Sequence, residues 1–170
     1  YNFEGSNYDK EDIIAKDWTG VDIKKESQKL TRISDSIQYK MIQDLIATGE
    51  YDIVFDDDSS GEAADIVAFK VDDENLTIDI EFYHLKYSHG DSPGARIDDL
   101  YEVCGQTQKS IFWVGKKYNG YNLCKHLISR EGKRISNQET TRFQLGDMDD
   151  LFIIRDKCLG GRYKCDFKMF

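Results

Sequence analysis

The first half of the chain carries the clearest pattern of apolar and polar positions. Apolar residues between 33 and 46 recur every three or four positions, as on one face of a helix. Ser34 stands where an N-cap is expected and Gly49 follows the last apolar position, so the pattern predicts a helix over about 34–48. The short apolar run that follows predicts a strand over 51–55.

Two longer runs then predict a pair of neighbouring strands. Residues 63–71 are apolar on both faces, which is typical of a central strand. A polar turn at 72–75 separates this run from a second predicted strand, over 76–87. One face of the second strand carries Ile78, Ile80, Phe82, His84 and Lys86.

The second half of the chain begins with a predicted helix and then shows weaker patterns. The helix is expected over about 96–116, after a loop around the single proline. Its apolar side carries Ile97, Leu100, Tyr101, Cys104, Gln108 and Ile111. Beyond residue 117 we expect a helix near 121–130 and strands near 141–145, 151–155 and 162–169. The order of these elements predicts an α/β fold, with a central mixed sheet flanked by helices.

Length and composition fit one globular domain over residues 1–170, with its core over about 34–116. The chain begins at Tyr1 instead of methionine, which predicts a domain taken from a larger protein. No apolar run approaches the length of a membrane span and no signal peptide is visible, so we expect a cytoplasmic protein that contacts no membrane. The formal net charge of −9 argues against a protein that coats nucleic acid, but not against an enzyme acting on it.

The four cysteines form no Cys-x-x-Cys pair, and we interpret them as reduced thiols. They are Cys104, Cys124, Cys158 and Cys165. A zinc site built from Cys124, His126 and the two late cysteines is a weak alternative, because the spacing fits the usual ligand patterns poorly.

Candidate metal ligands gather where the two central strands are expected to meet. Asp65 begins an otherwise apolar strand, and a buried carboxylate there needs a cation or hydrogen-bond donors. Glu62 lies three residues earlier and is a second possible ligand for Mg²⁺ or Mn²⁺. The alternatives are that Asp65 is a strand-end acid facing water and that Glu62 is a solvated loop residue.

His84 and Lys86 are expected beside Asp65, on the neighbouring strand. His84 is a candidate metal ligand or general base, and the alternative is a packed, hydrogen-bonded histidine. Lys86 is a candidate for stabilising the charge that develops on a phosphate during hydrolysis. Glu81 points to the opposite strand face unless a bulge turns it, and is therefore a reserve ligand.

The predicted helix after these strands carries several polar side chains that suit phosphate. Gln106 is a candidate for contacting a phosphate, a base or the attacking water, with plain solvation as the alternative. Arg96 and Lys109 are the candidate nucleic-acid contacts by charge type.

Together these segments resemble a restriction-endonuclease-like domain of the PD-(D/E)XK type. The resemblance covers about residues 34–113 and rests on GEAADIV (61–67), YHLKYS (83–88), PGARIDDLY (93–101) and GQTQKS (105–110). Similar domains occur at the C-terminal end of bacterial DEAD/DEAH-box helicase proteins. Two positions depart from the family pattern, since Ala64 replaces a proline and His84 replaces an acid.

The resemblance implies a metal-dependent nuclease domain. Its catalytic residues would be Asp65, His84, Lys86 and Gln106, its metal ligands Asp65, His84 and Glu62, and its nucleic-acid contacts Arg96 and Lys109. The cofactor would be Mg²⁺ or Mn²⁺, and the partners DNA and helicase domains of the same polypeptide. The alternative function is a non-catalytic module on the same fold, binding nucleic acid or docking a protein, which the histidine at position 84 favours.

Overall fold

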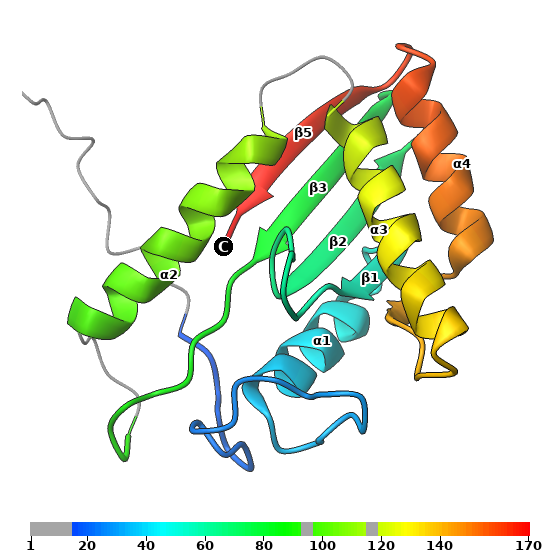
Figure 1. Cartoon of the computed structure of the whole chain (residues 1–170). Helices are drawn as coiled ribbons and strands as arrows, with labels where there is room; N and C mark the ends of the chain where they lie inside the picture. The colour runs from blue at the N-terminus through cyan, green and yellow to red at the C-terminus, as the bar shows by residue number, and fades with distance from the viewer. Residues whose placement is uncertain (1–14, 93–96, 115–118) are drawn as a thin grey trace, which may run out of the picture.

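A five-stranded mixed sheet forms the centre of the computed structural model, which describes residues 15–92, 97–114 and 119–170 (Figure 1). The strand order is β4-β1-β2-β3-β5. The strands are β1 (Ile53–Asp56), β2 (Ile66–Asp72), β3 (Thr77–Tyr83), β4 (Phe143–Leu145) and β5 (Lys164–Met169). Helices flank the sheet, so the predicted α/β class with a central mixed sheet is confirmed.

The hairpin of β2 and β3 lies in the middle of the sheet. Its antiparallel register runs from Ile66 opposite Tyr83 to Asp72 opposite Thr77. The first residues of β2 are fully buried because apolar side chains cover both faces of the sheet there. β1 and β4 continue the sheet antiparallel on one side, and β5 pairs parallel with β3 on the other.

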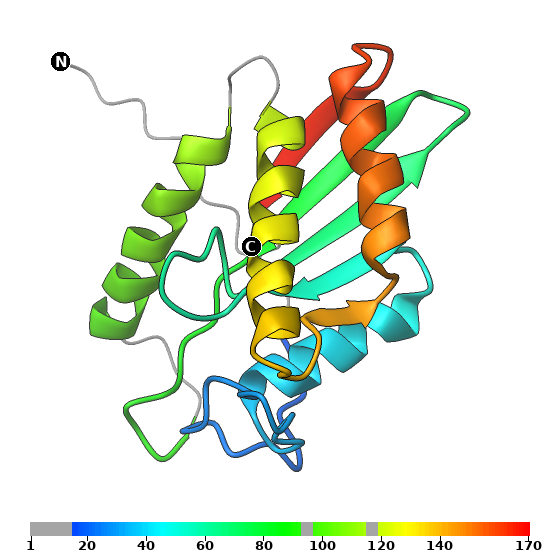
Figure 2. The same ribbon diagram turned by 45° about the vertical axis from the view of Figure 1, so that its right-hand side comes forward.

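Helices cover the two faces of the sheet unequally. They are α1 (Ile37–Thr48), α2 (Ile97–Ser110), α3 (Asn119–Ser136) and α4 (Met148–Leu159), with a 3₁₀ turn at Ile111–Trp113 after α2. α3 and α4 lie side by side across one face (Figures 1 and 2). α1 packs on the opposite face, and α2 stands at the edge of the molecule.

The core has one apolar cluster on each face of the sheet. The larger cluster joins the side of β3 that carries Ile78, Ile80 and Phe82 to α3 and α4. The smaller cluster joins Val54, Ile66 and their neighbours to the apolar side of α1. The predicted common face is therefore confirmed for Ile78, Ile80 and Phe82, whereas His84 and Lys86 lie beyond the end of β3.

Helix α1 ends where its sequence signals place it, but it begins at Ile37, later than predicted, because Ser36 and not Ser34 is the N-cap. Ser36, two residues after the predicted cap, accepts a hydrogen bond from the backbone N–H of Tyr39. Gly49 ends the helix in the left-handed conformation, with φ of 69°.

The predicted strand at 151–155 is wrong, because these residues lie inside α4. The helix is initiated by a capping box, in which Asp147 accepts from the backbone of Asp150 and the Asp150 side chain accepts from the backbone of Asp147. The apolar residues that follow then pack along α3 as one side of a helix.

β3 is shorter than predicted, since it ends at Tyr83 and not at 87. The backbone N–H of Leu85 donates to the Asp65 side chain instead of a strand partner, which ends the regular ladder. α2 likewise ends at Ser110 and gives way to the 3₁₀ turn before residue 116.

Gly120 sets how closely α3 approaches the sheet, and this gives a stability prediction. A Cβ added at Gly120 would meet the sulfurs of Cys165 and Cys158 at 2.8 and 2.9 Å. We expect Gly120→Ala to lower the free energy of unfolding by about 1–3 kcal/mol through overpacking. Gly132→Ala on the same helix is the matched control, because nothing lies within 4 Å of the added atom.

The control substitution should raise the free energy of unfolding by about 0.5–1 kcal/mol, since alanine favours a helix over glycine. Urea unfolding followed by circular dichroism measures both values. Equal stability of Gly120→Ala and the wild type would contradict the close approach of α3 to β5.

Candidate metal centre

Three carboxylates converge at the end of the central hairpin. Asp58, Glu62 and Asp65 each offer a ligand oxygen, and these oxygens all lie within 4.8 Å of one another. Asp65 is buried, whereas Asp58 and Glu62 are half-buried. Oxygen ligands at this spacing suit a hard divalent cation, so the cluster could hold a metal ion.

The loop between β1 and β2 brings the three acids together by doubling back on itself. Ser59 and Gly61 adopt positive φ angles of 122° and 84°, which turn the chain. The backbone N–H of Glu62 donates to the Ser59 carbonyl at 3.1 Å, and the Glu62 side chain accepts from the Ser59 N–H at 2.9 Å. Asp58 and Glu62 therefore meet across the turn, and Ser27 donates a short hydrogen bond to Asp58.

Two buried arginines fix the path of this loop. Arg130 of α3 donates to the carbonyls of Asp57 at 2.6 Å and Ser60 at 3.0 Å. Arg142, just before β4, donates to the carbonyls of Asp56 at 2.8 Å and Asp58 at 3.1 Å. These bonds occupy backbone oxygens on both sides of the turn, so the loop has few alternative conformations.

Asp57 also holds the loop in place, although it is not one of the three acids of the cluster. Its carboxylate forms an ion pair with Arg130 and accepts from the Ala63 N–H at 2.7 Å. Asp57 is fully buried, and burial raises the pKa of its carboxyl while the guanidinium of Arg130 opposes that rise. Removal of either partner would therefore leave an unpaired charge in the protein interior and destabilise the fold.

Asp65 is held against the neighbouring strand end. The backbone N–H of Leu85 donates to its Oδ2 at 2.8 Å. Burial raises the pKa of Asp65 to about 7, and the negative charges of Glu62, Asp58 and Glu26 add to this rise. A bound cation would offset this repulsion, so proton and cation compete for the same carboxylate.

His84 lies beside Asp65, and the ring nitrogen that faces Asp65, Nδ1, carries a lone pair. Ser110 donates its hydroxyl proton to the Ala63 carbonyl at 2.5 Å, so its oxygen must accept from His84 Nε2 at 2.7 Å. The Nε2–H tautomer leaves His84 Nδ1 without a proton, 3.8 Å from Asp65 Oδ2. Burial, and then the charge of Lys109, lowers the pKa of His84, which favours this neutral ring.

The row of Asp65, His84 and Ser110 is not a catalytic triad of the serine-hydrolase kind. Ser110 is fully buried and spends its proton on a backbone carbonyl, so its oxygen cannot attack a substrate. The row instead anchors the end of α2 to the strand ends that carry the acids.

Lys86 pairs with two carboxylates that are not members of the acidic cluster. Its ammonium is 2.7 Å from Glu102 and 3.5 Å from Glu26, and lies 4.2 Å from the centre of the Tyr87 ring. Burial alone would lower the pKa of Lys86, but its ion pairs with Glu102 and Glu26 outweigh burial and raise it. The negative charge of Glu26 also contributes to the raised pKa of Asp65.

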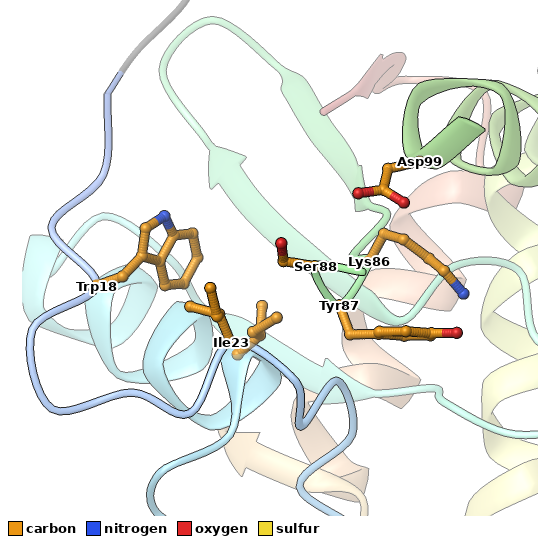
Figure 3. A pocket seen from close by; sticks show the side chains of 7 residues that line it. Trp18, Ile23, Lys86, Tyr87, Ser88 and Asp99 are labelled. Atoms are coloured by element: carbon orange, nitrogen blue, oxygen red, sulfur yellow. The ribbon is translucent and has the colours of Figure 1, made fainter. Parts of the chain in front are cut away.

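A small pocket opens beside Lys86 (Figure 3). Its volume is about 180 Å³. Apolar and aromatic side chains form much of its wall, with Trp18 and Ile23 on one side and Lys86 and Tyr87 on the other. The pocket therefore borders Lys86, and its lining includes none of the three acids of the cluster.

The other predicted site residues are more dispersed. Gln106 is half-buried on α2, and its Oε1 is buried without a hydrogen-bond partner. Lys109 is exposed in the last turn of α2, near enough to His84 to lower its pKa. Arg96 lies outside the described residues.

The reserve ligand Glu81 has a different role from the acidic cluster. Its carboxylate accepts hydrogen bonds from Tyr51 at 2.7 Å and Tyr83 at 2.6 Å, and it lies 3.7 Å from Lys70. Glu81 is therefore a structural acid on the face of the sheet covered by α1.

The cysteines do not form the alternative zinc site in the described part of the chain. The sulfurs of Cys158 and Cys165 lie 3.5 Å apart, and all four cysteines are free thiols. His126 faces Trp113, with ring centres 5.0 Å apart, and Asp57 at 3.9 Å. No cluster of potential metal ligands other than the acidic one occurs among the described residues.

Comparison with protein-family models, with characterised proteins and with solved structures finds no match to this chain. The resemblance to restriction-endonuclease-like domains therefore rests on the sequence motifs and stays a prediction. No helix in the described ranges is long and apolar enough to cross a membrane.

The sequence signals for the remaining site residues were weak. Asp58 belongs to an acidic run that is typical of a simple turn, and Glu26 lies in a segment without a clear period. No sequence pattern selects Glu102 as a site residue, and only its ion pair with Lys86 in the structure identifies it. Arg130 and Arg142 lie far along the chain from the loop that they hold, which no local pattern indicates.

The raised pKa of Asp65 predicts that metal binding depends on pH. Below pH 7 a cation must displace the Asp65 proton, so Mn²⁺ affinity should rise about tenfold per pH unit up to pH 7 and then level off. Calorimetry in two buffers of different ionisation enthalpy should detect release of nearly one proton at pH 6 and almost none at pH 8.

Asp65→Ala should lose this binding, whereas Glu74→Gln, a change at an exposed acid in the β2–β3 turn, should bind as the wild type does. Equal Mn²⁺ binding by Asp65→Ala and the wild type would refute the assignment of the ligand.

The ion pair that holds the acidic loop predicts a large loss of stability when Arg130 is replaced by an uncharged residue. Arg130→Met leaves Asp57 buried without its partner and should lower the free energy of unfolding by about 3–5 kcal/mol. Arg155→Met is the matched control, because Arg155 pairs on the surface of α4 with Asp156 and should cost less than about 1 kcal/mol.

A double substitution separates the ion pair from simple packing. Adding Asp57→Asn to Arg130→Met removes the unpaired charge, so the double variant should be more stable than Arg130→Met alone. Purely additive losses in chemical denaturation would show that the pair does not hold the loop.

Proposed function

We propose that this chain is a nuclease domain that hydrolyses phosphodiester bonds of DNA with the help of a divalent metal ion. The observation that carries the proposal is the convergence of ligand oxygens from Asp58, Glu62 and Asp65 within 4.8 Å of one another. The Lys86 ammonium lies 3.5 Å from Glu26, whose charge contributes to the raised pKa of Asp65. Carboxylates beside a lysine provide both a cation site and a positive charge for a phosphate. The motif order in the sequence supports the same class of reaction.

The donor set favours Mg²⁺ or Mn²⁺ as the cofactor. Three carboxylates are oxygen ligands, which both ions accept, and the Nδ1 lone pair of His84 suits Mn²⁺ better than Mg²⁺. Either ion, once bound, would lower the pKa of its water and neutralise charge on the phosphate.

Lys86 supplies positive charge and not a base. The ion pairs that raise its pKa keep its ammonium protonated at neutral pH. A phosphate entering beside the cluster would attract this ammonium away from Glu102, which is half-exposed and can turn into solvent. Glu26 accepts from the backbone N–H of Tyr87 at 2.9 Å, so it remains in place to pair with the Lys86 ammonium.

His84 and Ser110 act as positioning residues in this proposal. Their hydrogen bond fixes the ring so that Nδ1, and not Nε2, faces Asp65. Asp65 is fixed in turn by the Leu85 N–H, so the two strand ends present their ligands in one orientation. Preorganised ligands reduce the cost of ordering the site when the cation and the substrate arrive.

The net charge of −9 opposes nucleic-acid binding by the isolated domain. We therefore place the domain beside helicase domains of the same cytoplasmic polypeptide, which would supply most of the affinity for DNA. Lys109 is exposed near His84 and is the phosphate contact that the described residues offer on α2, with Arg96 as the further candidate from the sequence.

One observation favours a non-catalytic docking or nucleic-acid-binding module as the alternative. Lys86 is already neutralised by Glu102 and Glu26, an arrangement that also suits a purely structural ion pair. A folded wild-type protein that binds Mn²⁺ but cuts no DNA or RNA would support this alternative.

Replacement of Lys86 tests the catalytic assignment. Lys86→Ala should abolish nicking of plasmid DNA in the presence of Mn²⁺ while leaving the fold and metal binding intact, because the charge and not the ligand set is lost. Lys86→Arg should restore activity only in part, since a planar guanidinium cannot replace a compact ammonium.

Lys70→Ala is the matched control, because Lys70 also pairs with two glutamates and lies 4.5 Å from the centre of a tyrosine ring, but away from the cluster. Lys70→Ala should cut as fast as the wild type. Circular dichroism verifies that both variants are folded. A folded Lys86→Ala protein with wild-type nicking would show that the proposed mechanism is wrong.

A further inference from the structure

Helix α2 carries several apolar side chains that are exposed to solvent. Ile97 and Tyr101 are 70% and 73% exposed, and Ile111, directly after the helix, is 55% exposed. The opposite side of α2 faces the body of the protein, where Val103 is half-buried and Ser110 fully buried. An amphipathic helix normally buries its apolar side, so this inverted orientation indicates an interaction surface.

The exposed positions form a stripe with coiled-coil spacing. They are Ile97, Tyr101, Cys104, Gln108 and Ile111, and we call them the α2 stripe. Successive members are separated by four, three, four and three residues, as at the contact positions of paired helices. Cys104 is the midpoint of the stripe, because Ile97 and Ile111 lie seven residues to either side of it.

Charges beside the stripe select one orientation for a pair of such helices. α2 has Asp98 and Asp99 in its first turn and Lys109 in its last turn. In an antiparallel pair centred on Cys104, Asp98 of one helix lies beside Lys109 of the other, and this occurs twice. A parallel pair would place the acidic turns together and lose both contacts.

We propose that two copies of this chain associate through the α2 stripe, with the helices antiparallel and a two-fold axis beside Cys104. The interface is isologous, so each residue before Cys104 contacts a residue after it in the partner. One pair of 14-residue helices buries a small area, so the dimer is weak and depends on concentration. Glu102 and Ser110 connect the opposite side of α2 to Lys86 and His84, so the helix that carries the interface also packs against residues of the candidate site.

Sedimentation velocity over about 5–500 µM protein tests the association. We expect the wild type to change from monomer to dimer across this range. Ile97→Glu and Tyr101→Glu should each raise the dissociation constant by at least about tenfold. Ile153→Glu is the matched control, because Ile153 is a 55% exposed isoleucine on α4, and it should dimerise as the wild type does.

Charge reversal tests the antiparallel orientation. Asp98→Lys and Lys109→Asp should each weaken the dimer, and the double variant should recover it, because the two charges face each other across the axis. Failure of the double variant to recover would overturn this orientation.

Cross-linking tests the position of the axis. A short bismaleimide should join two wild-type chains through exposed Cys104, and Cys104→Ser should prevent this while Cys165→Ser should not. A wild type that stays monomeric at every concentration, or a dimer unaffected by Ile97→Glu and Tyr101→Glu, would overturn the proposal. None of these outcomes depends on metal binding or nuclease activity.

Discussion

The buried ion pair between Asp57 and Arg130 is the interaction on which the rest of the site depends. A charge pair in the interior is costly to desolvate and is held only by further hydrogen bonds. Here those bonds go to the backbone of the acidic loop, and Arg142 adds more from the other side. The hydrogen bonds that offset the desolvation of the ion pair therefore also fix the loop conformation that brings Asp58 and Glu62 beside Asp65.

The central hairpin supplies the second constraint, because its open end places Asp65 beside the residues that follow β3. The Leu85 N–H binds the Asp65 carboxylate, and His84 binds Ser110 of α2. The end of the β2–β3 pairing, the contact of α2 with the sheet and the position of the Asp65 carboxylate therefore depend on the same few residues. The outward-facing stripe of α2 is compatible with this arrangement, since the polar side of the helix is needed for the contacts with Lys86 and His84.

Local patterns predicted much of the fold, and Asp65, Glu62, His84 and Lys86 were all selected from strand alternation and family motifs. α4 was missed because four consecutive apolar residues fit a strand as well as a buried helix, and the capping residues Asp147 and Asp150 lie outside that run. Asp58 and Glu26 were missed for another reason. Their positions depend on hydrogen bonds between residues far apart in sequence, such as Tyr87 with Glu26, which carry no periodic signal.

The central claim is that the carboxylates of Asp58, Glu62 and Asp65 hold one divalent cation. The most direct measurement is an anomalous difference map from crystals soaked in MnCl₂ at pH 7.5. The account predicts a peak within roughly 2–2.5 Å of oxygens from all three residues. A map without a peak among these carboxylates, at a concentration that saturates binding in solution, would contradict it.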